Sequence, residues 1–332
     1  MPHGVTPIRQ RRLHIVLPIA LGTIVVAWLA VVAFRYYRFR DLREKLSQAE
    51  ALLGRVGDPA VRRDLAAHLD YLRERMRKPR RRDILYASLL GEAGELYDAC
   101  RGKFPAPHLR PGHHVIATVS QVDGAVLPTS VAVPEGWDGA EPLPLVLFLH
   151  AAGVRETTDC FPADGHPGAL CVEPFARGSH DYMGVQMTAV EDCLADVRRR
   201  YPVARLYVLG SSMGGLGTWL FAERHVAEVS GVSPWMANAD PAAWQGLWKP
   251  EAKAPASASG RACAALAAAR MPVARVEQLA SRPGLPIYVG HGADDAIVPV
   301  GHSDSMVEKL RKLGARSLRF DRRDGLGHAD LP

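Results

Sequence analysis

The stretch Gly210-Ser211-Ser212-Met213-Gly214 has the Gly-x-Ser-x-Gly form that places a nucleophilic serine on a tight turn between a strand and a helix. Residues 204–209 before it are a short apolar run, which predicts a buried strand. Residues 215–224 after it have apolar side chains about one turn apart, which predicts a helix. The alternative is a glycine-rich turn without chemistry. The strand and helix on either side favour a nucleophilic Ser212.

A serine hydroxyl is a weak nucleophile without a base, and the base needs an acid to fix its tautomer. Downstream, residues 285–290 predict a strand that leads into His291 and then Asp294-Asp295. Catalytic groups of open α/β sheets collect beyond the carboxyl ends of strands, so this loop holds the candidate acid. His328, the last histidine, follows a glycine-flanked loop and is the candidate base. His291, its rival, fits a structural role at the end of its strand.

An oxyanion in the transition state needs two backbone donors. The first candidate is the N–H of Met213, because the first N–H groups of a helix have no intrahelical partner. The second should come from the loop after an earlier strand, His150-Ala151-Ala152-Gly153, and we favour the N–H of Ala152.

Strands and helices alternate from near Pro111, and this pattern predicts an α/β domain over residues 111–332, with a mostly parallel sheet and helices on both faces. Asp123-Gly124 indicates a hairpin between its first two strands. Residues 235–282 interrupt the alternation as a possible cap, whose tryptophans 235, 244 and 248 either line an apolar pocket or pack the insertion itself. Beside the strands that precede residues 210 and 291, strands are predicted at 115–122, 126–133, 142–150, 169–173, 229–233 and 317–321, and further helices at 184–200 and 304–313.

From about residue 115 to 328 the chain resembles the esterase and prolyl-oligopeptidase-like branch of the α/β-hydrolase superfamily, which includes carboxylesterases and polyester-depolymerase-like enzymes. The resemblance implies Ser212 as nucleophile, Asp295 as acid and His328 as base. It departs at Ala151, where the family has glycine, and in ending four residues after His328, where relatives continue into a helix. The motifs that carry it are Pro144-Leu145-Val146-Leu147-Phe148-Leu149-His150, the turn at 210–215, His291-Gly292 with Asp295 and Val298-Pro299, Gly327-His328, and Phe175-Ala176-Arg177-Gly178 with Asp181-Tyr182 and Gly184.

Residues 13–34 are apolar apart from a few interruptions and follow a basic tail at residues 1–12. At about 1.5 Å per residue they span roughly 33 Å as a helix, enough for a bilayer core of roughly 30 Å. A cleaved signal peptide is the alternative, but its apolar region would be shorter and no good Ala-x-Ala site is present. We therefore expect a retained transmembrane anchor.

Two features of the sequence give opposite predictions of which side of the membrane the domain faces. Three arginines precede the apolar segment and five Lys or Arg follow it by residue 45, which indicates a cytoplasmic C-terminal side. Cys160 and Cys171 lie in a Pro- and Gly-rich loop, where a disulfide would suit an oxidising compartment, although two unrelated thiols explain them equally well. On balance we favour the extracytoplasmic side.

A helical segment is predicted at residues 41–110, between the anchor and the α/β domain. Apolar side chains recur about every turn at 41–56, 60–78 and 83–100, which predicts three amphipathic helices. Such stripes are packing surfaces, so we expect this segment to dock on the main domain or set its distance from the membrane.

The formal net charge of +6 comes largely from arginines beside the apolar segment and from the basic run at 77–82. No aromatic residues interleave with that run, so nucleic-acid binding is not indicated. None of the five cysteines has metal-ligand spacing, and no cofactor is implied.

The sequence thus predicts a membrane-anchored serine hydrolase that acts on a small-molecule ester, with no prediction of oligomeric state. A serine peptidase is one alternative, since the same triad cleaves amides. A non-catalytic membrane scaffold with a degenerate hydrolase fold is the other, and Ala151 and the short C-terminus are its support.

Overall fold

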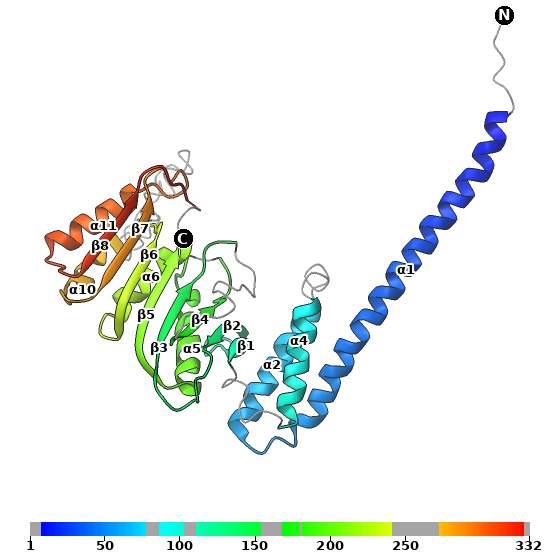
Figure 1. Cartoon of the computed structure of the whole chain (residues 1–332), viewed down its shortest axis with the longest axis horizontal. Coiled ribbons are helices and arrows are strands. Elements are labelled where there is room, and N and C mark those ends of the chain that lie inside the picture. Colours follow the sequence, from blue (N-terminus) through cyan, green and yellow to red (C-terminus); the bar gives the residue numbers. More distant parts are fainter. Residues whose placement is uncertain are drawn as a thin grey trace, which may run out of the picture.

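The computed structural model describes residues 8–77, 86–102, 111–153, 168–179, 181–240 and 272–328 (Figure 1). Eight strands form one sheet, and helices follow several of them. The strands are β1 (Gly112–Val119), β2 (Val126–Val133), β3 (Leu143–Leu149), β4 (Leu170–Pro174), β5 (Val203–Ser211), β6 (Val229–Trp235), β7 (Ile287–Gly292) and β8 (Leu318–Arg323). The helices are α1 (Ile8–Leu53), α2 (Pro59–Arg77), α4 (Tyr86–Cys100), α5 (Val185–Arg200), α6 (Met213–Arg224), α9 (Pro272–Arg275), α10 (Glu277–Ala280) and α11 (Gly301–Lys312).

The sheet has the strand order β1-β2-β4-β3-β5-β6-β7-β8. β1 and β2 pair antiparallel, and β2 also pairs antiparallel with β4. From β4 to β8 every pairing is parallel. This arrangement confirms the predicted α/β class with its mostly parallel sheet.

The predicted hairpin is present, but its first strand begins and ends three residues earlier than the expected 115–122. Val119 pairs with Val126, so residues 120–125 form the loop and the predicted strand end at residue 122 is wrong. Within that loop the Ser120 N–H donates to the Ala125 carbonyl at 2.8 Å, and the Asp123 carboxylate accepts from the Ala125 N–H at 3.1 Å. The first bond continues the register of the β1–β2 ladder by one residue, and the local Asp123 bond closes the turn beyond it.

Burial alternates along the central strands. Leu145, Leu147 and Leu149 of β3 are fully buried, whereas Val146 and Phe148 between them are half-buried. A continuous apolar run is typical of a strand buried on both faces, but the structure buries one face of β3 more completely. α6 packs against β3, β5 and β6, and α11 packs against β7 and β8. The core therefore lies between these strands and helices. That helices cover both faces of the sheet stays a prediction.

The N-terminal helices form a second apolar cluster, in which the predicted stripes are buried. α1 runs unbroken from the expected anchor into the expected first helix, because no glycine or proline lies between residues 24 and 53. α2 begins where the Asp58 carboxylate accepts from the N–H groups of Ala60 and Val61, at 2.7 and 3.2 Å. The cluster reaches the sheet through Ala117 of β1, so the helical unit docks on this edge of the sheet.

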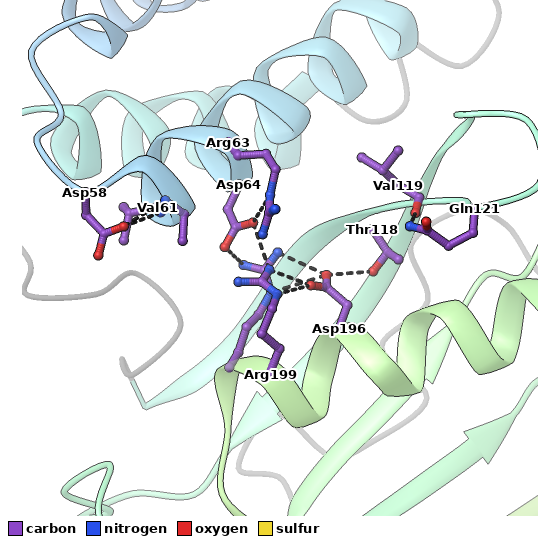
Figure 2. Close-up of polar contacts among 11 residues, drawn as sticks. Asp58, Val61, Arg63, Asp64, Thr118, Val119, Gln121, Asp196 and Arg199 are labelled. Atoms are coloured by element: carbon purple, nitrogen blue, oxygen red, sulfur yellow. Dashed lines mark hydrogen bonds and ion pairs between the residues drawn. The ribbon is translucent and has the colours of Figure 1, made fainter.

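Ion pairs hold the same junction together (Figure 2). Asp64 of α2 accepts from Arg199 of α5 at 2.9 Å and pairs with Arg200 at 3.0 Å. Asp196 of α5 accepts from Thr118 of β1 at 3.0 Å and from Arg200 at 3.0 Å. The two carboxylates and two guanidinium groups thus link α2, β1 and α5.

Among the residues described, no helix has both the length and the apolar character needed to cross a membrane. Residues 13–22 of the expected anchor belong to the stretch of α1 whose side chains lie outside the described set.

Candidate active site

The turn after β5 has the strained geometry that its sequence predicts. Ser212 stands between β5 and α6 with φ 56°, in the left-handed region that non-glycine residues rarely adopt. Its N–H donates to the Trp235 carbonyl at 2.8 Å, which ties the turn to the end of β6. The strain and the tie together present the Ser212 hydroxyl at the carboxyl edge of the sheet.

Glycines allow helix α6 to lie directly on the strands. A Cβ on Gly214 would lie 1.8 Å from the Leu149 carbonyl oxygen, and one on Gly210 would lie 2.5 Å from the Gly214 carbonyl oxygen. One turn further, a Cβ on Gly217 would meet the Tyr182 ring at 2.5 Å. The first turn of α6 therefore fits against the end of β3 only because these positions have no side chain.

Three predicted site residues from distant parts of the sequence lie in one hydrogen-bonded chain. The distance from Ser212 Oγ to His328 Nε2 is 2.8 Å. The distance from His328 Nδ1 to Asp295 Oδ2 is 2.7 Å. With Nδ1–H donating to the carboxylate, Nε2 is left as the acceptor for the serine hydroxyl. This is the tautomer that a general base requires.

Asp295 and the adjacent Asp294 differ in burial and in hydrogen bonding. Its carboxylate is buried, and Oδ1 accepts the N–H groups of Ile297 and Val298 at 2.9 and 2.8 Å. The neighbouring Asp294 is exposed, and its N–H donates to the Leu326 carbonyl at 3.0 Å. Of the two adjacent aspartates, the structure brings Asp295 to His328.

The loop before His328 is fixed to the end of β7. The Ala293 N–H donates to the Arg323 carbonyl at 2.8 Å, and the Asp294 N–H bond to Leu326 adds a second tie. A Cβ on Gly292 would lie 2.3 Å from the Leu326 carbonyl oxygen, so the two loops touch through their backbones. These contacts hold His328 beside Asp295.

The two predicted oxyanion donors lie in segments that meet at Gly214. Met213 is the first residue of α6, so its N–H has no intrahelical carbonyl. Ala152 belongs to the loop after β3, where His150 Nδ1 lies 2.8 Å from the Ala151 carbonyl oxygen. Because C=O and N–H point in opposite directions across a trans peptide, this contact turns the Ala152 N–H away from the His150 ring.

Sequence reasoning matched the loop that follows β4 only as a family motif and missed its supporting role. His150 Nε2 lies 2.9 Å from the Phe175 carbonyl oxygen, and the Tyr182 hydroxyl donates to the His150 carbonyl at 3.1 Å. Ala176, Arg177, Asp181 and Tyr182 all have positive φ, between 42° and 69°. Such strain persists only where surrounding contacts fix it, and no sequence periodicity signals it.

The possible cap and the possible disulfide lie largely outside the described residues. Residues 241–271 of the possible cap, with Trp244 and Trp248, lie outside the described residues, as does Cys160. Trp235, at the end of β6, is half-buried, and its indole N–H donates to Ser233 Oγ at 2.7 Å. Within the described ranges, no three His, Cys, Asp or Glu side chains gather as metal ligands would.

Comparison with known proteins adds to this geometry. No protein-family model and no curated protein matches the sequence. Among solved structures, the chain is similar to an S-formylglutathione hydrolase from Agrobacterium tumefaciens, with 17% identity, TM-score 0.51 and coverage of 66% of this chain and 89% of that one. It is also similar to an acylaminoacyl peptidase from Pyrococcus horikoshii, with 14% identity, TM-score 0.50 and coverage of 70% and 39%. A thermostable esterase aligns at 21% identity and TM-score 0.48, over 64% of this chain and 54% of the esterase.

This chain has the α/β-hydrolase fold. It spans about half or less of the esterase and the peptidase, and most of the S-formylglutathione hydrolase. In the α/β-hydrolase fold the strained serine, the acid and the histidine follow one another along the chain, as Ser212, Asp295 and His328 do here.

Proposed function

We propose that this chain is a membrane-anchored serine hydrolase whose substrates are carboxylic esters. The observation that carries the proposal is the hydrogen-bonded chain from Ser212 through His328 to Asp295, at 2.8 and 2.7 Å. Nucleophilic acyl transfer needs a nucleophile, a base and an acid that orients the base. Here these are a serine in a strained left-handed turn, a histidine whose Nε2 can accept a proton, and a buried carboxylate that accepts several hydrogen bonds.

In the first half of the reaction, Ser212 Oγ attacks the ester carbonyl while its proton passes to His328 Nε2. Asp295 holds the imidazolium that forms. The N–H groups of Met213 and Ala152 stabilise the oxyanion of the tetrahedral intermediate. The intermediate collapses when His328 gives the proton to the leaving alkoxide, which departs as the alcohol and leaves an acyl group on Ser212.

In the second half, His328 takes a proton from water, and the resulting hydroxide attacks the acyl carbonyl. The same two N–H groups stabilise the second oxyanion. Collapse returns the proton from His328 to Ser212 Oγ and releases the carboxylic acid. The cycle uses no cofactor, because every proton is transferred between Ser212, His328, water and the substrate.

Esters are preferred to amides in this proposal because alkoxides leave more readily than amines. The test is a panel of p-nitrophenyl acyl esters of increasing chain length beside aminoacyl and prolyl amides, with wild type and Ser212→Ala compared. We expect turnover of at least one ester, lost in Ser212→Ala. Amide turnover without ester turnover would favour a peptidase.

The membrane part of the proposal rests on residues 13–34. Their length and basic flanks support an anchor, and the described part of the segment exposes large apolar side chains, with Ile24 66%, Trp28 62% and Phe34 63% exposed. We expect the full chain to stay with membranes after a carbonate wash, and a chain beginning at Asp41 to be soluble. A mature N-terminus near Phe34 would instead show a cleaved signal peptide.

We also propose that the hydrolase domain faces the extracytoplasmic side. Its support is the possible disulfide between Cys160 and Cys171, although Cys171 lies buried in β4 and not in the expected loop. Protease added to sealed membranes of known orientation should digest the domain from the extracytoplasmic face, and protection there would reverse the assignment.

A further inference from the structure

His291 lies beside the candidate acid although it is not a member of the predicted triad. Its side chain is fully buried at the end of β7. Its Nε2 lies 2.8 Å from the Val298 carbonyl oxygen and 3.3 Å from Asp295 Oδ2, and its Nδ1 lies 2.7 Å from Ser303 Oγ. The ring thus connects the acid to the first turn of α11.

These partners settle which ring nitrogen carries the proton. The two groups that face Nε2, the Val298 carbonyl and the Asp295 carboxylate, are both acceptors. If Nε2 carried no proton, its lone pair would face theirs in a buried site, and the three would repel one another. Ser303 can donate its hydroxyl proton to Nδ1. Burial lowers the pKa of His291, which favours the neutral ring with a single N–H. The neutral ring therefore has Nε2–H donating to the Val298 carbonyl, with Asp295 Oδ2 3.3 Å from the same nitrogen and Ser303 fixing this tautomer.

The consequence for Asp295 is that polar groups at fixed positions surround both carboxylate oxygens. Oδ1 accepts the N–H groups of Ile297 and Val298, and Oδ2 accepts His328 at 2.7 Å. His291 Nε2 bonds the Val298 carbonyl and lies 3.3 Å from Oδ2, as the second polar neighbour of this oxygen. A buried carboxylate is held in one orientation when each oxygen is donated to from fixed positions.

We propose that His291, in the tautomer set by Ser303, is a positioning residue that holds the Asp295 carboxylate in line with His328. The inference rests on the proposed function. His291 touches neither substrate nor Ser212, so its effect passes through Asp295 to the orientation of His328. Loss of its N–H lets the carboxylate rotate about its own axis, and fewer molecules then have His328 ready to accept the Ser212 proton.

The matched variants are His291→Gln and His291→Asn. Both place a neutral amide in the same buried site, but the glutamine amide N–H reaches about as far as Nε2, whereas the asparagine amide ends near Nδ1. With p-nitrophenyl acetate and folded protein, we expect kcat of His291→Asn to fall about tenfold with KM unchanged, and His291→Gln to recover most of that loss. Ser303→Ala should lower kcat about threefold, because the ring can then adopt the other tautomer.

Equal kcat losses in the two His291 variants, or a change in KM alone, would overturn the inference, because simple packing does not distinguish the reach of the donor. If neither His291 variant folds, unchanged kcat in Ser303→Ala would overturn it. Ser212→Ala and Asp295→Asn are assayed beside them. If those two remain active, the proposed function fails; if they are inactive while His291→Asn is fully active, only this inference fails.

Discussion

Helix α6 ends at two polar sites that differ in how their buried groups are paired. At its N-terminal end Ser212 bonds His328, which bonds an Asp295 carboxylate with donors on both oxygens. At its C-terminal end Glu223 is 2% exposed, and among the described residues both of its carboxyl oxygens are buried without a hydrogen-bond partner. Among the described residues, one end of the helix has the donors that a buried carboxylate needs, and the other lacks them.

The difference shows what a buried acid requires to act as an anion. Burial raises the pKa of Glu223 to about 8, so this carboxyl is largely protonated at neutral pH. Asp295 lies as deep in the protein, but fixed N–H groups and His328 replace the water it has lost. Donors rather than burial therefore distinguish the end of the helix that holds the candidate site. Two changes test this contrast, and a third tests how the helix is packed.

The largest loss of activity is expected at Asp295, the carboxylate that accepts hydrogen bonds on both oxygens. Asp295→Asn keeps the size of the side chain but removes the charge that orients His328, and ester turnover should fall by up to about 10⁴-fold. Asp294→Asn, at the exposed neighbour, should cost less than about tenfold, comparable with one hydrogen bond. Turnover is measured after each variant is shown to fold. Equal or reversed losses would assign the acid to the wrong residue.

The next effect concerns the carboxyl without donors. Its pKa is about 8 in the folded protein against an ordinary 4.5, so the folded state holds a proton that the unfolded state has lost between these values. The free energy of unfolding of the wild type should therefore fall as pH rises from about 4.5 to about 8, by a few kcal/mol and at most about 5. Glu223→Gln should remove this dependence and be the more stable protein at pH 8.5.

Urea unfolding at pH 5 and pH 8.5 measures the difference, with the exposed Glu135→Gln as the control. That control should keep the slope of the wild type. A wild type and a Glu223→Gln variant with the same pH dependence would mean that Glu223 has donors in solution, and the contrast between the helix ends would be lost.

The smallest of the three effects tests how closely the first turn of α6 must approach β3. Gly214→Ala would place a Cβ 1.8 Å from the Leu149 carbonyl oxygen, so the helix has to move, at a cost of about 3 kcal/mol. Gly301→Ala is the matched control at the start of α11, where a Cβ meets nothing within 4 Å. It should be neutral or slightly stabilising. Similar melting temperatures for the two variants would show that the helix contact is not tight.

Local patterns in the sequence predicted much of the domain. The strand and helix around Ser212, the hairpin and the candidate acid and base all follow from apolar runs, glycines and spacing, because each depends on neighbours in the chain. The position of β4 between β2 and β3 was not predictable in this way, since it depends on pairing between distant strands. The same holds for the Asp64–Arg199 pair, whose partners are 135 residues apart.

The candidate site was predictable in its members but not in its support. Ser212, Asp295 and His328 have motif neighbours. The sequence predicts only a structural role for His291, because its contact with Asp295 exists only after β7 ends and the chain turns back. Glu223 gave no signal at all. It lies in an apolar helix, but only the packed structure shows that its carboxyl is buried.

The most direct test of the central claim is the site of covalent labelling by a fluorophosphonate, read by peptide mapping. Ser211 and Ser212 are adjacent, but only the hydroxyl of Ser212 bonds His328 in the structure. We predict a phosphonyl adduct on Ser212, unchanged labelling of Ser211→Ala and none of a folded Ser212→Ala. An adduct on Ser211, or a folded wild type that does not label, would contradict the account, and the latter would favour the non-catalytic scaffold.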